Sequence, residues 1–399
     1  MSSCEVGGFV DALRRELTGD ILPFWMNRMV DAKNGGFLSR IACSGRPTED
    51  APKGAVLNAR LLWTFAAAYR VLGGREYLDM ATRARDYLLE HFIDGQYGGV
   101  YWSLDHTGRP LETKKQTYAI GFAIYGLSEY HRATGDGQSL RVAIDLFHAI
   151  ERHAFDELYG GYVEALDRRW QPLEDMRLSE KDANLSKTMN THLHIIEPYT
   201  NLYRVWKDPL LERRVRDLLS VFVDKIIQGD GHLGLFFDER WQLQSNIVSY
   251  GHDIEASWLL HEASLELGDA DWLQAVEPLV IKIADAAAQG IQADGSIIYE
   301  HDRTAGHYDR DRHWWPQAEA VVGYYNIYQH FGDRNALRRA MAAWQYIDRH
   351  MIDRTAGEWH WSILPDGSPN TREDKAGFWK CPYHNSRMAL ELIERTERS

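Results

Sequence analysis

The sequence has few of the features that mark whole classes of proteins. Only three of its 399 residues are cysteines, and Cys4, Cys43 and Cys381 lie too far apart to form a CxxC metal motif or a disulfide framework. No run of lysine and arginine exceeds two residues, and the formal net charge is −13. We therefore expect neither a nucleic-acid partner nor an anionic membrane partner.

Long apolar stretches are also missing. No segment approaches the roughly 20 apolar residues that cross a membrane. The N-terminal stretch MSSCEVGGFVDALRRELTG lacks the apolar core of a signal peptide. We therefore expect a cytoplasmic protein. No proline-, glycine- or serine-rich linker divides the chain, which predicts a single domain over residues 1–399.

Aromatic residues, in contrast, are abundant, with 14 Trp and 20 Tyr. Large aromatic side chains fill large cores. Their flat faces also complement the C–H faces of pyranose rings, so the composition fits either a large core or a sugar site.

One local pattern returns six times along the chain. Each copy has a turn-forming glycine beside alternating aromatic or apolar residues, as in NGGFLSR and YGGVYWSLD. We anchor the copies on Gly36, Gly99, Gly161, Gly234, Gly295 and Gly357. The period is close to 62 residues, with an insertion of about eleven residues before the fourth copy. Such periodicity indicates a repeat architecture.

Each copy predicts a short β-hairpin followed by two helices. In the first copy the helices are expected over residues 54–73 and 76–93. The first is apolar on most faces and so belongs inside, whereas the second has a polar face and belongs outside. Six inner helices ringed by six outer helices make an all-α (α/α)6 barrel with hairpins at one end. An open solenoid is the alternative, but a first unit no more polar than the others favours closure.

Unusual polar and aromatic residues recur where each inner helix begins. They are Arg60, Tyr118, Asn190, His194, His252, Glu255, Trp314, Trp315, Glu319, Trp379 and His384. All inner-helix starts lie at one end of a closed barrel, so these side chains should converge on one site. The three histidines are taken to occupy equivalent places. His192 is interpreted as structural, and Trp63 as a core residue.

The same residues also have simpler interpretations. A buried histidine is often only a satisfied core residue. Glu255, Glu319 and Arg60 each precede a glycine by thirteen residues. The two carboxylates could be structural partners of polar groups on the inner helices, and Arg60 could be structural if it has an anionic or polar partner. On a helix, His252 and Glu255 would lie about 5–6 Å apart, which also fits half of a metal site.

Three kinds of chemistry fit this set of residues. A metal site is weakly supported, because His252 and Glu255 would be only half of a dinuclear carboxylate set and the sequence has neither an HExxH motif nor a Cys/His cluster. Glycoside hydrolysis could use Glu255 and Glu319, but it leaves the histidines without a role. Proton transfer next to a sugar carbonyl uses the histidines as acid and base and Arg60 to stabilise an enediolate. A carbohydrate-binding protein without catalysis is a further alternative.

Four longer motifs carry a family resemblance. They are NTHLHIIEPYTNLYRVW, GHDIEASWLL, HWWPQAEA and FWKCPYHNSRMALE. With them the chain resembles the cellobiose 2-epimerases of the wider N-acylglucosamine 2-epimerase superfamily over its whole length. The resemblance implies an (α/α)6 barrel, no metal and no cofactor. It also implies epimerisation at C2 of the reducing-end sugar of a β-1,4-linked disaccharide, through an open-chain cis-enediolate.

The resemblance also implies roles for individual positions. His252 and His384 match the two acid–base histidines, His194 a residue that assists ring opening, and Arg60 the arginine beside the C1 and C2 oxygens. Glu255 and Glu319 match carboxylates that orient histidines and sugar hydroxyls. The implied substrate contacts are Tyr118, Asn190, Trp258, Trp315 and Trp379, with Asp182 in the inserted loop.

Two positions depart from the family pattern. Pro198 replaces a helix-forming residue, and proline inside a helix introduces a kink. Ser386 stands where glycine is commoner. Both are near the implied site, so substrate preference could differ, and a mannose isomerase or an N-acylglucosamine 2-epimerase acting on monosaccharides is the nearest alternative. A barrel that closes on itself, without a heptad seam, predicts a monomer.

Overall fold

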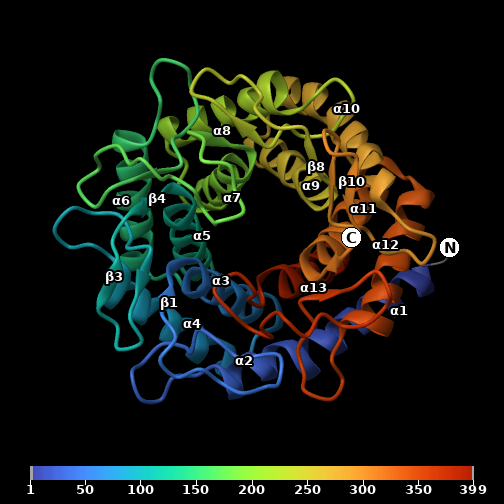
Figure 1. Cartoon of the computed structure of the whole chain (residues 1–399), viewed down its shortest axis with the longest axis horizontal. Coiled ribbons are helices and arrows are strands. Elements are labelled where there is room, and N and C mark those ends of the chain that lie inside the picture. The colour runs from blue at the N-terminus through green and yellow to red at the C-terminus, as the bar shows by residue number, and fades with distance from the viewer. Residues whose placement is uncertain (1–2, 398–399) are drawn as a thin grey trace.

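Six largely buried helices form the inner ring around the axis of the molecule (Figure 1). The computed structural model describes residues 3–397; Met1, Ser2, Arg398 and Ser399 lie outside the described residues. Each inner helix contacts the next, and the last contacts the first, so the ring is closed. The predicted (α/α)6 barrel is confirmed. The inner helices are α3 (Ala55–Leu72), α5 (Thr117–Thr134), α7 (Met189–Val205), α9 (Tyr250–Leu267), α11 (Trp314–Phe331) and α13 (Tyr383–Glu397).

The outer ring is built from amphipathic helices that cover the inner ones. It consists of α4 (Arg75–Tyr87), α6 (Gly137–His153), α8 (Pro209–Val221), α10 (Ala270–Ala287), α12 (Arg334–Tyr346) and the N-terminal pair α1 (Ser3–Glu16) and α2 (Leu22–Arg28). Tighter or wider helical turns follow several of them, at Leu17–Ile21, Leu88–Phe92, Phe222–Ile226, Ala288–Gly290 and Ile347–Met351.

The sixth repeat differs from the predicted pattern of two helices. It contains only α13, and its outer partner is the N-terminal helix α1, which packs against α13. The chain thus begins with the outer helix that its last repeat lacks. Within residues 3–397, no helix is long and apolar enough to span a bilayer.

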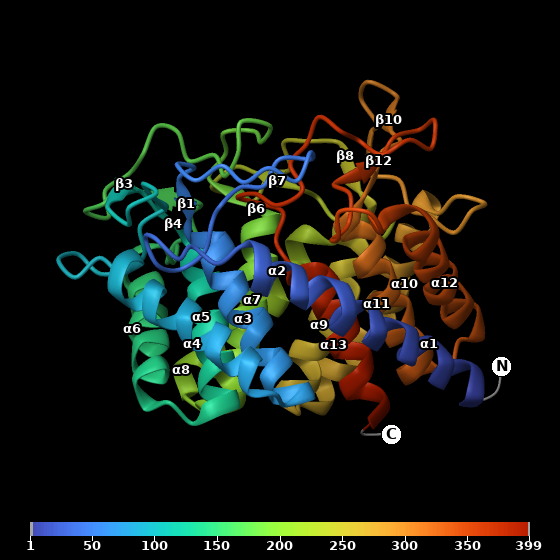
Figure 2. The same cartoon turned by 90° about the horizontal axis from the view of Figure 1, so that it is seen from below.

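Short strands gather at one end of the barrel (Figure 2). They are β1 (Lys53–Gly54), β2 (Ser103–Leu104), β3 (Pro110–Glu112), β4 (Lys115–Gln116), β5 (Ala165–Leu166), β6 (Lys187–Thr188), β7 (Phe236–Phe237), β8 (Ile247–Ser249), β9 (Glu300–Asp302), β10 (His307–Asp309), β11 (Arg312–His313) and β12 (Ser362–Ile363). All pairs are antiparallel, and their sheet orders are β1-β2-β3, β4-β5, β6-β7, β8-β9-β10 and β11-β12.

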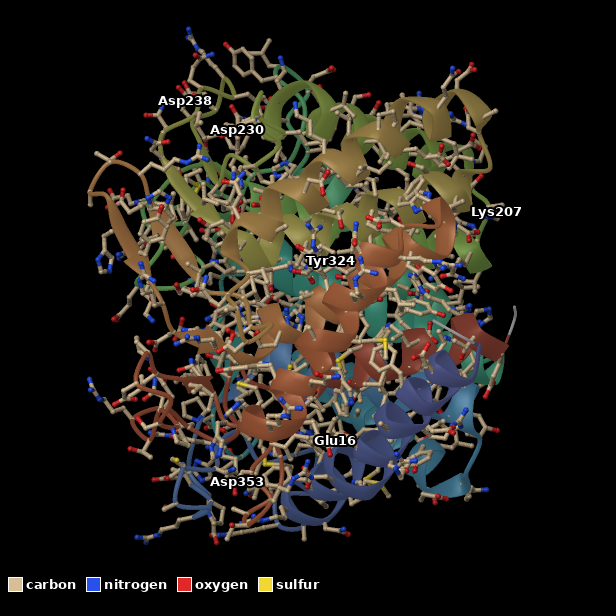
Figure 3. All side chains as sticks on the ribbon, turned by 90° about the vertical axis from the view of Figure 1, so that its right-hand side faces the viewer. Glu16, Lys207, Asp230, Asp238, Tyr324 and Asp353 are labelled. Atoms are coloured by element: carbon tan, nitrogen blue, oxygen red, sulfur yellow. The ribbon has the colours of Figure 1, made fainter. Side chains whose placement is uncertain are left out.

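These strands connect neighbouring repeats as well as forming hairpins. The strand that enters each of the inner helices α3, α5, α7, α9 and α11 pairs with the hairpin of the next repeat. A bridge between Ile41 and Ala376 joins the last repeat to the first. The hairpin end therefore closes around the axis together with the helices. Figure 3 shows Asp230 and Asp238 at this end and Lys207 at the opposite end.

Turn geometry corrects one anchor of the repeat. Gly36, Gly99 and Gly161 have φ angles of 60°, 71° and 78°, a region that favours glycine. The proposed fourth anchor, Gly234, does not have a positive φ; the turn is made by Gly231, with φ of 92°. The sequence pattern had placed this anchor three residues too late. The fourth turn, bridged by Ile227 and Leu233, is also one residue shorter than the first three.

Candidate active site

Four of the predicted polar residues share one register on the inner helices. Arg60, His194, Glu255 and Glu319 are each the sixth residue of α3, α7, α9 and α11. Because the helices start at the same end of a closed ring, these side chains form one layer below the hairpins. His252 and His384 are the third and second residues of their helices. The expectation that the three histidines occupy equivalent places was therefore wrong.

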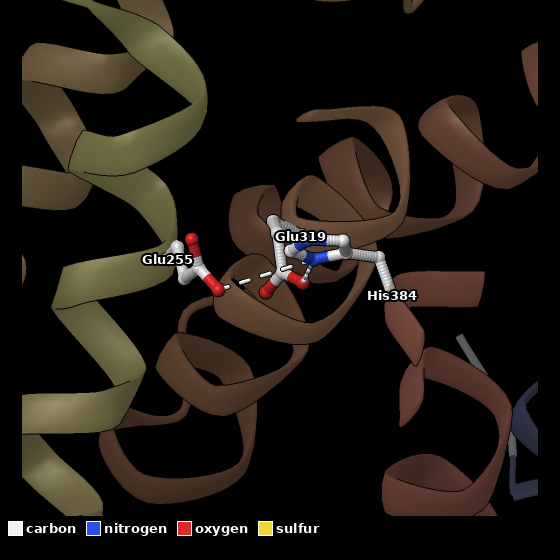
Figure 4. Close-up of side chains that lie close together, drawn as sticks. All are labelled: Glu255, Glu319 and His384. Atoms are coloured by element: carbon white, nitrogen blue, oxygen red, sulfur yellow. Dashed lines mark hydrogen bonds and ion pairs between the residues drawn. The ribbon is translucent and has the colours of Figure 1, made fainter. Parts of the chain in front are cut away.

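His384 is held by a carboxylate from the neighbouring inner helix. Its Nδ1 lies 2.6 Å from Oε1 of Glu319 (Figure 4). The other oxygen of Glu319 accepts a hydrogen bond of 3.0 Å from the indole nitrogen of Trp258. This arrangement fixes the ring of His384 and leaves its Nε2 without a hydrogen bond to residues 3–397. Burial lowers the pKa of His384 to about 3, so the imidazole is neutral at pH 7.

Arg387 links three buried carboxylates beneath the histidines. Its Nη2 donates to Glu255 and Glu319 at 2.6 Å each, and its Nη1 bonds Glu197. Burial alone would raise the pKa of Glu319, but the charge of Arg387 and the bond to His384 lower it. Burial and the neighbouring Glu319 charge raise the pKa of Glu255 well above its usual range. Of the two carboxyl groups, Glu255 is therefore the one that takes up a proton more readily.

His252 is held differently from the expectation. Its Nδ1 lies 2.8 Å from the hydroxyl of Ser249. Glu255, which was expected to orient a histidine or a sugar hydroxyl, does not bond His252. Its Oε1 accepts from Arg387 and lies 3.9 Å from Nδ1 of His384, while its Oε2 has no partner among residues 3–397. His252 and Glu255 are one turn apart on α9. Glu255 bonds Arg387 below, whereas His252 bonds Ser249 on the hairpin side. Burial, with His194 and His384 nearby, lowers the pKa of His252 to about 3.

A kink in α7 directs His194. Pro198 has no N–H to bond the carbonyl of His194 four residues earlier, and His194 has the non-helical angles φ −90° and ψ 15°. The predicted kink is therefore present. Gly121 of α5 accommodates the displaced carbonyl, since a Cβ there would lie 2.6 Å from it. The Nδ1 of His194 lies 2.9 Å from Glu197, three residues on.

Arg60 lies in an aromatic cage. Its Nη2 donates to the hydroxyl of Tyr118 at 2.8 Å, and its guanidinium lies over the rings of Phe122 and Tyr383 at 4.2 and 4.6 Å. The Nε of Arg60 is buried and has no hydrogen-bond partner among residues 3–397. A buried guanidinium with an unused donor is suited to bind an oxygen of an incoming molecule.

The predicted substrate contacts divide into two groups. Trp315 packs against His252 and His384, with ring centroids 4.6 and 5.7 Å apart, and Trp379 packs against Tyr118 at 6.2 Å. Asn190 keeps a buried Oδ1 without a partner in the described chain. Trp258, in contrast, is fully buried behind Glu319, so it has no surface to offer a sugar.

Asp182 lies in the inserted loop of the third repeat. Its carboxylate accepts hydrogen bonds from the backbone and hydroxyl of Ser179, at 2.8 and 2.9 Å. Burial and the charge of Asp309 raise the pKa of Glu300 on β9, and the charge of Asp182 adds to this effect. The loop therefore lies close to the hairpin of the fifth repeat.

Sequence reasoning missed three residues of the site: Glu197, Tyr383 and Arg387. Tyr383 donates to Glu197, and both bond Arg387. A signal was present for Arg387, because it is an arginine in the apolar run of the last helix and is fully buried. Glu197 follows His194 by three residues, the same spacing as His252 and Glu255.

Glu255, Glu319 and His384 also have the donor atoms of a metal site. One atom of each lies within 4.8 Å of the others. However, Arg387 already donates to both carboxylates, and His384 Nδ1 bonds Glu319. A divalent cation at this point would lie beside a fixed guanidinium charge. The donor set therefore fits an internal ion network better than a metal ion.

Comparison with known proteins adds to this geometry. The family model for N-acylglucosamine 2-epimerases matches residues 35–386. The chain belongs to the N-acylglucosamine 2-epimerase family. The cellobiose 2-epimerase of Bacteroides fragilis is 60% identical over 96% of this chain and 97% of that protein. The cellobiose 2-epimerase of Ruminococcus albus is 42% identical over 97% and 98% of the two chains.

Solved structures agree with the family assignment. The cellobiose 2-epimerase from Bacillus thermoamylovorans matches with a TM-score of 0.93 and 41% identity, covering 98% of this chain and all of that one. A D-mannose isomerase matches with a TM-score of 0.84 and 20% identity, over 97% of both chains, and so shares the fold. This member of the N-acylglucosamine 2-epimerase family is an enzyme of the isomerase class, as its resemblance predicted.

Proposed function

We propose that the protein epimerises C2 of the reducing-end sugar of β-1,4-linked disaccharides, without a cofactor. Cellobiose would become glucosyl-mannose, and lactose and mannobiose are further candidate substrates. The names of the 60% and 42% identical relatives support cellobiose as the first substrate to test. The three histidines, the guanidinium of Arg60 and the tryptophans at the hairpin end support the chemistry.

The reaction balances with two histidines and solvent as proton carriers. In the open-chain sugar, the C1 aldehyde acidifies the proton on C2. A neutral imidazole takes that proton, and the resulting cis-enediolate carries negative charge on oxygen, next to Arg60. The second histidine returns a proton to the opposite face of C2. Because burial lowers the pKa of both rings to about 3, this ring first takes up that proton from solvent when the open-chain sugar is bound. Solvent then restores the starting protonation of both rings.

The observation that carries this proposal is the matched setting of His252 and His384. Each ring is fixed through Nδ1, one by Ser249 and the other by Glu319, which leaves both Nε2 atoms for proton transfer. Both rings pack against Trp315. Because they come from α9 and α13, two inner helices separated by α11, they can approach a sugar from different sides.

The remaining residues support binding and ring opening. His194, paired with Glu197, would assist opening of the hemiacetal. Tyr118, Asn190 and Trp315 would contact the reacting sugar. Trp379 would lie under the second sugar, and Asp182 would contact it from the inserted loop.

Glycoside hydrolysis fits the geometry less well. Glu255 and Glu319 both bond one nitrogen of Arg387, and oxygens of the two lie within 4.8 Å. Hydrolases separate their two carboxyl groups by about 5–9.5 Å so that the glycosidic bond lies between them. Glu319 is also fully engaged by His384 and Trp258, which leaves it no freedom to act on a substrate.

Product analysis tests the proposed function. Purified protein is incubated with cellobiose, lactose, mannobiose, mannose and N-acetylglucosamine, and C2 epimers are quantified by NMR. We expect epimers of the disaccharides, at full rate after EDTA treatment. Trp379→Ala should reduce turnover of disaccharides much more than turnover of monosaccharides. Faster epimerisation of a monosaccharide, or release of free glucose, would instead support one of the alternatives.

The proposal also treats the chain as one catalytic domain that acts as a monomer. The closed inner ring and the complete set of catalytic side chains within one chain support this. Light scattering coupled to size exclusion should give the mass of one chain, and activity should not depend on protein concentration.

A further inference from the structure

Glu358 occupies a backbone position that is taken by glycine in the first three repeats. It directly precedes Trp359, the residue that bridges back across the turn of the sixth repeat. The φ angle of Glu358 is 61°. A side chain with a Cβ is strained in this left-handed region. In the first three repeats the same position, also with a positive φ, is taken by Gly36, Gly99 and Gly161.

The side chain of Glu358 is fully buried, and both carboxylate oxygens accept hydrogen bonds. Oε2 accepts from the indole of Trp25 at 2.6 Å. Oε1 accepts from Nζ of Lys380 at 3.0 Å and from Nδ2 of Asn385 at 2.9 Å. Lys380 is also fully buried, and within residues 3–397 its ammonium has no other hydrogen-bond partner. Without Glu358 this charge would be buried and unpaired.

Oε1 of Glu358 also accepts from the backbone N–H of Trp359 at 2.8 Å. Its two side-chain partners bracket the segment that carries the active-site residues. Lys380 follows Trp379, and Asn385 follows His384. Residues 377–382, which connect Ala376 to α13, have no regular secondary structure. Apart from a backbone hydrogen bond from Gly377 to Lys380 at 3.0 Å, side chains hold this connection. Glu358 holds the connection at Lys380 and the start of α13 at Asn385.

The other repeats show what the same space holds when glycine is present. A Cβ at Gly36 would lie 2.7 Å from the ring of Tyr87, and one at Gly99 would lie 2.8 Å from the ring of Trp170. Aromatic rings fill the space in those repeats. In the sixth repeat, a carboxylate and its partners fill it instead. The inner helix of this repeat begins beside His384.

We propose that Glu358 is a positioning residue for epimerisation. It fixes the connection that presents Trp379 and His384. Glu358 acts only through Lys380 and Asn385. On its other side it is held by the N-terminal helices, since Trp25 bonds its carboxylate and Asp20 accepts from its backbone N–H at 3.0 Å.

This inference rests on the proposed function, and two variants with a matched control test it. Glu358→Gly installs the residue of the first three repeats and removes the strain, while Glu358→Gln keeps the size of the side chain. Asp353→Asn is the control, because Asp353 pairs with the buried Lys375 at 2.5 Å in the same hairpin but makes no hydrogen bond to residues 377–385.

We measure kcat and KM on cellobiose, melting temperature, and hydrogen exchange of peptides from residues 377–386. Both Glu358 variants should lose at least tenfold in kcat and should exchange faster in these peptides. Asp353→Asn should stay within twofold of the wild-type kcat and exchange normally there, even if its melting temperature falls.

A Glu358→Gly enzyme with wild-type kcat and exchange would overturn the inference. So would equal losses of kcat in Glu358→Gln and Asp353→Asn, since that would indicate only a structural role. The two proposals fail separately: if the wild-type protein makes no epimer, the proposed function fails, whereas hydrogen exchange still reports whether Glu358 holds the segment.

Discussion

Nδ1 of His384 and Oε1 of Glu319 lie 2.6 Å apart, across the boundary between α11 and α13. The carboxylate holds the imidazole in the tautomer that leaves Nε2 free, and it would stabilise the ring when protonated. The first prediction follows from this pair.

Glu319→Gln should lower kcat by about 10²-fold, in the range of a lost acid–base contribution. An amide can still bond the ring but cannot stabilise its charged form. Steady-state assays on cellobiose measure the effect. Glu129→Gln is the control, because Glu129 is buried and bonds Arg70 at the other end of the inner ring. A Glu319→Gln enzyme within threefold of wild type would contradict the role given to the pair.

Arg387 should be essential for stability as well as activity. Arg387→Met leaves Glu197, Glu255 and Glu319 without their shared cation, and removing one member of such a buried network costs about 3–5 kcal/mol. Urea unfolding at pH 7 measures this loss. Without Arg387 the pKa of Glu197 and Glu319 is no longer lowered, so in the variant these carboxylates become protonated as the pH falls, and the difference from wild type should shrink. A constant difference between pH 4 and pH 8 would argue against an electrostatic cause.

Pro198 should tune the position of His194. Pro198→Ala restores an N–H for the carbonyl of His194 and should raise the unfolding free energy by about 1 kcal/mol. Proline in a regular helix costs about 3 kcal/mol, and the gain is smaller here because the surrounding residues already accommodate the kink. A straighter α7 displaces His194, so kcat/KM should fall about tenfold. Thermal unfolding and kinetics check both values.

Gly121→Ala is the companion variant. A Cβ 2.6 Å from the carbonyl of His194 should destabilise the protein by about 1–3 kcal/mol. Pro198→Ala with unchanged kcat/KM would separate the kink from the function of His194.

Buried histidines should make the fold sensitive to mild acid. Burial lowers the pKa of His192 to about 4, whereas an unfolded histidine titrates near 6.5. Between these values the unfolded state binds more protons, so stability falls as pH falls from 6.5 to 4, by up to about 3 kcal/mol for this residue. His192→Gln should show a shallower decline in urea unfolding series. An unchanged slope would show that His192 does not titrate in this range.

The sequence predicted the frame of the site more fully than its contacts. A period near 62 residues was sufficient to place Arg60, His194, Glu255 and Glu319 at the starts of inner helices. Contacts between helices depend on how far each helix is rotated about its axis, and periodicity does not contain that angle.

This limit explains the particular errors. His252 and Glu255 are neighbours on one helix, so the sequence suggested a pair, but Glu255 turns toward Arg387 of α13. Trp258 was assigned to a sugar, although its indole bonds Glu319. The N-terminal helix α1 completes the sixth repeat, which no local pattern could reveal because its partner lies at the other end of the chain.

Isotope exchange with single-histidine variants tests the central claim most directly. Cellobiose and its C2 epimer are incubated separately in D2O with wild-type protein, His252→Asn and His384→Asn, and deuterium at C2 is followed by NMR. Wild type should epimerise both and label C2. In each variant the epimerisation rate should fall by at least 10³-fold, in the range of a lost acid–base group. Each variant should still exchange the C2 proton of one of the two substrates for deuterium, and that substrate should differ between the variants. Exchange of both substrates by either variant would contradict two opposed histidines.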